Sequence, residues 1–319
     1  MEIAELRSCK LIVGSGLTAG LAANLLCDVH ELSLSFLPFA KFSSMPEILP
    51  RRAFFDALEL SRAEEAAVIS KVSTSAREVV WNDGNVSAQR SLESTDDFFI
   101  YDKGLLASWL LDRAIQRGVH AIKSHAQSST IQEECKNFDA VLDCRGAGAV
   151  AKDPGYTIRQ ETLSSTYCTY AIIKRPKSMS NDHLVFWSVL NEYGLQRTFF
   201  AMPCGTELTS VGGSYCEGDQ LDITALLDMM CSLGYPLTPS DVKLTANVAP
   251  HRFSCSHSHP KIIPLGDAAR STCPLTEYGV MSALSQLLQL RGDNGLLPSV
   301  IRRPASSQID PHIPVELFL

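Results

Sequence analysis

The chain has 319 residues, 45% of them hydrophobic, and a formal net charge of −7. A chain of this length can bury an ample core, as one large domain or as two closely joined ones. Its acidic balance and the lack of a long basic run argue against nucleic acid or an anionic membrane surface as a partner.

Ten cysteines are scattered along the chain without a CxxC pair, and the first five residues lack the basic start of a secretory signal. Both features favour a reducing, cytoplasmic location with free thiols. The longest uncharged apolar stretch, residues 11–27, is too short and too rich in small polar residues for a membrane span. It predicts a buried strand and helix instead.

A glycine-rich turn follows the first predicted strand. A short apolar run leads into Gly14 and Gly16, with Ala19 where a third glycine often lies, then Gly20 and a run of helix formers. This is the strand, turn and helix that open a dinucleotide-binding βαβ unit. In such a unit Gly14 permits the turn, Gly16 lets the backbone approach a pyrophosphate, and Ala19 with Gly20 lets the helix pack closely on the strand. The helix N-terminus then offers N–H groups to the phosphates.

The second predicted strand, residues 31–37, departs from this pattern at its end. A dinucleotide-binding unit usually carries an acidic residue there for the ribose hydroxyls. Here Pro38 follows, and no carboxylate appears until Glu47. Ribose binding is therefore left open, or falls to Arg51 or Arg52.

Apolar periodicity and turn residues predict the other elements of the first half. They are a loop entering a helix at 40–60, a β-hairpin within 68–96, an amphipathic helix over 101–118, and strands at 119–122 and 139–143.

From about residue 156 to 250, Val, Thr, Tyr and Phe become frequent. Strands are predicted at 166–174, 183–190, 197–202 and 208–215, with a helix at 222–233. We expect an antiparallel sheet inserted into an α/β, Rossmann-like fold, positioned as a wall facing a substrate. Most of its aromatic residues belong to the core, with alternate ones shaping an apolar substrate site; the set is Phe186, Trp187, Phe199, Phe200 and Tyr215.

A strand at 261–265 and a helix at 281–290 return to the first fold. The predicted domains are therefore 1–155 with 260–295, an inserted domain at 156–259, and a tail of little regular structure at 296–319.

Three motifs occur in order along the chain. They are Gly14-x-Gly16-x-x-Ala19-Gly20, then Asp143-Cys144-Arg145-Gly146, and then Gly266-Asp267-Ala268-Ala269 followed by Pro274 and Gly279. This combination resembles the glutathione-reductase-type FAD-dependent oxidoreductase superfamily. Within it, the chain is similar to aromatic-hydroxylase-type monooxygenases, geranylgeranyl reductases and lycopene cyclases.

The resemblance implies an FAD site and assigns residues to it. The first motif would hold the pyrophosphate, Asp267 would bind the ribityl hydroxyls, and Lys103 stands where the superfamily usually has Arg. The turn at Pro274 and the helix that starts near Gly279 would point at the isoalloxazine. The implied cofactor-binding set is Gly14, Gly16, Thr18, Ala19, Gly20, Lys103, Asp267, Pro274, Gly279 and Val280.

Three functions remain open at this point. The first is an FAD-dependent monooxygenase of specialised metabolism that acts on a small apolar or aromatic molecule. Because no second glycine fingerprint exists, its electrons would come from transiently bound NAD(P)H or from a partner flavin reductase. The second is a lycopene-cyclase-like cyclase or isomerase with Glu277 as catalytic acid. The third is a flavin-fold protein without FAD that serves as a binding or assembly partner.

Other candidate residues carry weaker signals. The stretch with His251, Cys255, His257 and His259 has no matching second ligand pair, so no metal is predicted. Asp143 is expected to cap a strand end. Cys273 is the one thiol retained as a redox candidate, and the other cysteines are expected to be small buried hydrophobes.

Overall fold

The computed structural model describes residues 9–28, 31–36, 46–73, 78–82, 87–91, 98–123, 128–160, 166–180, 182–190, 196–204, 207–216, 221–248, 253–271 and 278–292. The predicted tail, together with Pro38, Cys273, Pro274 and Glu277, lies outside the described residues.

The N-terminal strand lies at the centre of a five-stranded sheet whose described pairings are all parallel. Its order is β16 (Ile262–Pro264), β8 (Ala140–Asp143), β1 (Cys9–Val13), β2 (Glu31–Phe36) and β7 (His120–Lys123). These strands follow the predicted apolar runs closely.

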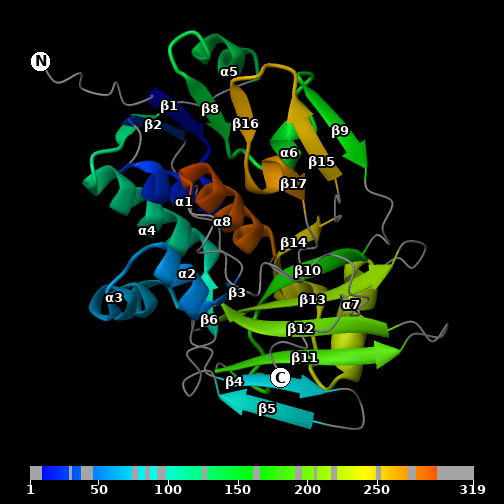
Figure 1. The fold of residues 1–319 in the computed structure, drawn as a ribbon. Helices are drawn as coiled ribbons and strands as arrows, with labels where there is room; N and C mark the ends of the chain where they lie inside the picture. Colours follow the sequence, from blue (N-terminus) through cyan, green and yellow to red (C-terminus); the bar gives the residue numbers. More distant parts are fainter. Residues whose placement is uncertain are drawn as a thin grey trace, which may run out of the picture.

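Helices cover both faces of this sheet (Figure 1). Because strand side chains alternate, Ile12 and Leu142 face one side and Leu11 and Val141 the other. The first side packs against α1 (Leu17–Leu26), α4 (Lys103–Gln116) and α8 (Tyr278–Arg291). The second packs against α5 (Ser128–Glu134) through Ile131. The two sides form separate apolar clusters.

A second, seven-stranded sheet is antiparallel except where β11 pairs with β4. Its order is β14 (Val242–Val248), β10 (Thr166–Lys174), β13 (Leu208–Cys216), β12 (Gln196–Cys204), β11 (His183–Leu190), β4 (Glu78–Asn82) and β5 (Ser87–Ser91). Helix α7 (Ile223–Ser232) packs on one face. The predicted α/β fold class, a parallel sheet with a separate antiparallel sheet, is confirmed.

Several local predictions differ from the structure. The hairpin β4–β5 was assigned to the first domain, but it extends the second sheet because β4 pairs with β11. The predicted loop before α2 (Arg51–Ala57) contains strand β3 (Pro46–Pro50), which pairs with β6 (Phe98–Asp102). Tyr101 and Asp102 belong to β6 rather than to the helix, and Asp102 caps α4 by accepting from the Leu105 N–H.

Short elements complete the described chain. They are α3 (Arg62–Val72), α6 (Ala147–Val150), β9 (Tyr156–Gln160), η1 (Pro239–Asp241), β15 (Phe253–His257), η2 (Gly266–Ala268) and β17 (Arg270–Ser271). Strands β17, β15 and β9 form a small sheet beside the parallel one. Within the described residues, no helix has the length and apolar character needed to cross a membrane.

Candidate functional site

The turn between β1 and α1 requires glycine at its first position. Gly14 has a φ of +138°, and a Cβ there would lie 2.6 Å from the carbonyl oxygen of Cys144. The Cys144 N–H in turn donates to the Val13 carbonyl at 2.8 Å. Gly14 therefore lets the chain turn tightly against the end of β8.

Gly16 lies in the opposite environment, at the N-cap of α1. Among the described residues, a Cβ on Gly16 would meet no atom within 4 Å, and no side chain caps this helix end. The first N–H groups of a helix have no partner within the helix, and they favour an anion when no side chain accepts from them. The space at Gly16 suits a phosphate group.

Gly20 serves a different contact from the one predicted. A Cβ on Gly20 would lie 2.6 Å from Cβ of Leu110, so its small size lets α1 approach α4 rather than the strand. The buried Asn24 joins the same two helices, donating to the carbonyls of Gly20 and Leu110 at 2.8 and 2.7 Å. Ala19 is fully buried in the apolar core. Gly20 and Ala19 therefore both serve the packing of α1.

The Gly-Asp motif lies directly against α1. Gly266 has a φ of +59°, and a Cβ there would collide with the side chain of Thr18. Asp267, the next residue, has an exposed side chain in η2. The structure thus brings Thr18 of the first motif beside the loop that carries Asp267.

Lys103 begins α4 and points into a group of polar side chains near this loop. Its Nζ forms an ion pair with Oε1 of Glu47 at 2.7 Å, and the Tyr101 hydroxyl donates to the other Glu47 oxygen at 2.5 Å. Although the Asp267 side chain is exposed, desolvation by the surrounding protein raises its pKa; the charge of Lys103 acts to lower this pKa and that of Glu47 to raise it. Sequence analysis did not select Glu47, because only the pairing of β3 with β6 brings it next to Lys103.

Tyr170 of β10 faces the same group from the second sheet. Burial is the main cause that raises its pKa, and the charges of Lys103 and Glu47 also act on it. We call these five residues the Glu47 cluster: Glu47, Tyr101, Lys103, Tyr170 and Asp267. They come from four separate parts of the chain, and their polar groups gather where the two sheets approach each other.

The aromatic residues of the second sheet divide between its faces. Trp187 and Phe199 pack in the core beneath α7. On neighbouring strands, Phe186 lies opposite Phe200, and Phe200 lies opposite Gly212. Gly212 in turn lies opposite Tyr170. The three aromatic residues therefore share the other face of the sheet. This is the face that carries Tyr170 toward Lys103; its role as a wall for a substrate stays a prediction. Tyr215 lies on β13.

Helix α8 is held to the Gly-Asp loop by a side-chain hydrogen bond. Gly279 and Val280 lie in the first turn of this helix and are half-buried. About two turns later, Oε1 of Gln286 accepts from the Gly266 N–H at 2.9 Å.

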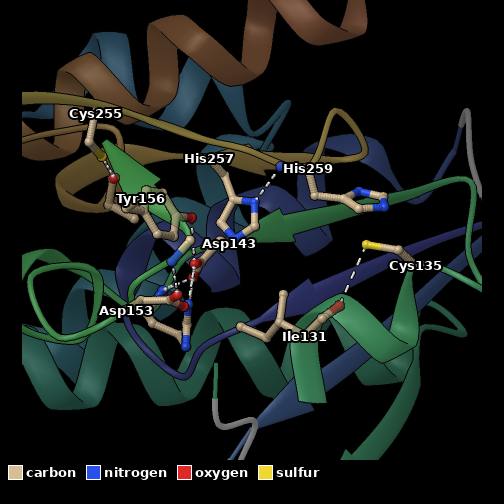
Figure 2. A network of polar contacts seen from close by, with 11 residues as sticks. Ile131, Cys135, Asp143, Asp153, Tyr156, Cys255, His257 and His259 are labelled. Carbon is tan, nitrogen blue, oxygen red and sulfur yellow. Dashed lines mark hydrogen bonds and ion pairs between the residues drawn. The ribbon is translucent and has the colours of Figure 1, made fainter. Parts of the chain in front are cut away.

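Asp143 belongs to a buried polar network at the end of β8 (Figure 2). Its fully buried carboxylate accepts from Arg145 at 2.7 Å and from the Tyr156 hydroxyl at 2.7 Å. Arg145 also pairs with Asp153 at 2.8 Å. Burial alone would lower the pKa of Arg145, but the bonds and charges of the two carboxylates raise it. Asp143 has a structural role at the strand end, as expected.

His257 and Cys255 of β15 complete this network. The His257 ring packs edge-on against Tyr156, and its Nδ1 accepts from the His259 N–H at 2.9 Å. The Cys255 thiol donates to the Ala268 carbonyl at 2.5 Å. Among the residues that the structure describes, no three His, Cys, Asp or Glu side chains are arranged to hold a metal ion. His251 lies outside them.

Comparison of the sequence with protein-family models and with curated proteins finds no match. Solved structures do match in fold. The tetrameric form of 2-methyl-3-hydroxypyridine-5-carboxylic acid oxygenase has a TM-score of 0.62 at 16% identity, covering 90% of this chain and 82% of that chain. A flavin-dependent halogenase from Xanthomonas campestris has a TM-score of 0.62 at 12% identity, covering 92% and 72%. A flavoprotein/dehydrogenase from Cytophaga hutchinsonii has a TM-score of 0.62 at 13% identity, covering 89% and 79%.

These matches extend over most of the chain. At 12–16% identity they show a shared fold. The choice among reactions therefore depends on the site itself.

Proposed function

We propose that this protein binds FAD and is an FAD-dependent oxidoreductase of monooxygenase type that acts on a small apolar or aromatic molecule. One observation carries the proposal: the uncapped, open start of α1 at Gly16 lies beside the loop of Asp267, through the contact of Thr18 with Gly266. An anion site beside a loop that carries a carboxylate suits the pyrophosphate and the ribityl hydroxyls of one dinucleotide.

The residues present fit FAD at these two points. The α1 N-terminus supplies backbone N–H groups and a positive dipole end, and no side chain of the described part of the chain takes up the space over Gly16. Asp267 is exposed and offers two acceptor oxygens. The likeness in fold to a flavin-dependent halogenase and a flavoprotein/dehydrogenase supports the same cofactor.

When bound, FAD supplies the redox chemistry of the reaction, including the activation of dioxygen. The chain's own residues would bind the cofactor and orient the substrate. Gly279 and Val280, in the first turn of α8, would place that helix's positive end near the flavin ring. The face with Tyr170, Phe186 and Phe200 would exclude water and align an apolar substrate. Electrons would come from transiently bound NAD(P)H or from a partner flavin reductase, in the cytoplasm.

The visible absorption spectrum tests the proposal. Purified protein, or protein reconstituted with FAD, should show a flavin band and should consume oxygen faster when a substrate is added. Protein that stays colourless on FAD titration would instead favour a binding or assembly role. A flavin band with turnover but no net consumption of reductant would favour the cyclase hypothesis, for which Glu277→Gln is the direct test.

A further inference from the structure

The loop that carries Asp267 is short and has an unusual backbone. Its first residue, Gly266, adopts the left-handed conformation with a φ of +59°, and only three residues form η2. A polar side chain on such a loop can bind a ligand with precision only if neighbouring elements fix the backbone. Two side chains that the proposed function does not use lie against it.

The first is Gln286 of α8. Its Oε1 accepts from the Gly266 N–H at 2.9 Å, and it is half-buried within the helix that also packs on α1. A half-buried Gln costs free energy unless its amide forms a hydrogen bond. Here the amide oxygen of Gln286 accepts from the backbone N–H of Gly266, the residue immediately before Asp267.

The second is Cys255 of β15, which contacts the end of the loop. Its thiol donates to the Ala268 carbonyl at 2.5 Å, and its N–H donates to the Ala269 carbonyl at 2.9 Å. Burial raises the pKa of this thiol to about 11, so the sulfur keeps the proton that it donates. Cys255 therefore holds the residue immediately after Asp267.

We propose that Gln286 and Cys255 are positioning residues that fix Asp267 for the ribityl chain of FAD. The inference rests on the proposed function. Gln286 holds the backbone before Asp267 and Cys255 holds it after, so the carboxylate keeps one direction relative to the open start of α1. Neither residue contacts the cofactor in this scheme; both act through Asp267.

Hydrogen exchange tests the geometry in the protein without FAD. Gln286→Met keeps the length of the side chain but removes the oxygen acceptor, so the Gly266 amide should exchange faster. Gln286→Glu retains an acceptor and should restore protection. Gln289→Met, on the exposed side of the same helix, is the matched control and should leave Gly266 unchanged. Unchanged exchange in Gln286→Met would overturn the role of Gln286.

Quenching of FAD fluorescence tests the consequence. Gln286→Met and Cys255→Ala should each raise the Kd for FAD about tenfold, the effect of losing one hydrogen bond. Gln286→Glu and Cys255→Ser, which keep an acceptor and a donor, should remain within about threefold of the wild type. At saturating FAD, the visible circular dichroism of the flavin should differ in Gln286→Met, because a displaced Asp267 alters how the cofactor is held.

The outcomes separate the two proposals. If the wild type binds FAD and the variants bind it equally well, the positioning role is wrong and the proposed function stands. If Gln286→Glu binds as poorly as Gln286→Met, and both melt at a lower temperature without FAD, the role of Gln286 is only structural. If the wild type does not bind FAD, both proposals fail.

Discussion

Thr18 and Gly266 lie in contact, although one belongs to the first turn of the chain's first helix and the other follows the last strand of the parallel sheet. A side chain on Gly266 would occupy the position of the Thr18 side chain. This contact joins the turn between β1 and α1 to the loop of Asp267, and it brings together two motifs that lie far apart in the sequence.

Gly266→Ala should therefore destabilise the free protein through two separate effects. The left-handed backbone costs about 1–2 kcal/mol for a residue with a Cβ, and overpacking against Thr18 adds about 1–3 kcal/mol. Gly234→Ala is the matched control, because Gly234 has a φ of +93° but open space around it. Urea unfolding should show the larger loss for Gly266→Ala. Equal losses would contradict the contact with Thr18.

Gly16→Ala should separate cofactor binding from stability. Gly16 has a φ of −86° and no neighbour near an added Cβ, so the free energy of unfolding should change by less than about 1 kcal/mol. The added methyl would occupy the space assigned to the pyrophosphate, and the Kd for FAD should rise by about tenfold or more. Gly14→Ala should instead lose stability, because its Cβ would meet the Cys144 carbonyl. Wild-type affinity in Gly16→Ala would count against the proposed site.

Asp267→Asn should stabilise the free protein at neutral pH while weakening FAD binding. Desolvation by the surrounding protein raises the pKa of Asp267 above 3.8 in the folded state, so wild-type stability falls as the pH rises from below 3.8 through that higher value. The gain in the variant should be less than about 1 kcal/mol, since the side chain remains exposed. In unfolding measured from pH 3 to 7, the gain in stability of Asp267→Asn should appear above the raised pKa of Asp267 and vanish below 3.8.

Asp241→Asn is the control with the opposite sign. Hydrogen bonds from the side chain and backbone of Thr238 lower the pKa of Asp241, so its contribution is present above 3.8 and is lost as the pH falls. This variant should lose stability at neutral pH and match the wild type in acid. A gain at neutral pH in both variants would indicate a general effect of net charge instead.

Arg145→Met should be strongly destabilising. Its guanidinium pairs with Asp143 and Asp153, whose side chains are only 0% and 3% exposed, so the variant leaves two buried carboxylates without a cation. Removing one partner from such a group costs about 3–5 kcal/mol. The control is Arg52→Met, which breaks a pair with Asp56 that is exposed at both ends and should cost less than about 1 kcal/mol. A small loss in Arg145→Met, measured by urea unfolding, would show that the network is not a structural unit.

The sequence alone determined what depends on neighbours along the chain. Apolar runs and helix formers predicted β1, α1, β2, β8 and the main strands of the second sheet, because side-chain periodicity is a local property. The glycines of the first turn predicted its form in the same way, since a φ of +138° is a property of Gly14 itself. The motifs also selected Asp267 and Lys103, although the cofactor that they would bind stays a prediction.

Only the tertiary structure decided which distant residues meet. Strand pairing depends on long-range packing, so β3 and the position of β4 beside β11 could not be predicted from local pattern. The same pairing brings Glu47 to Lys103, and the packing of α8 brings Gln286 to Gly266. Neither residue has a local signal, because a carboxylate on a short strand and an amide within a helix acquire their roles from partners far along the chain. The contact between Thr18 and Gly266 is of the same kind, since it is formed by the packing of a helix against a loop.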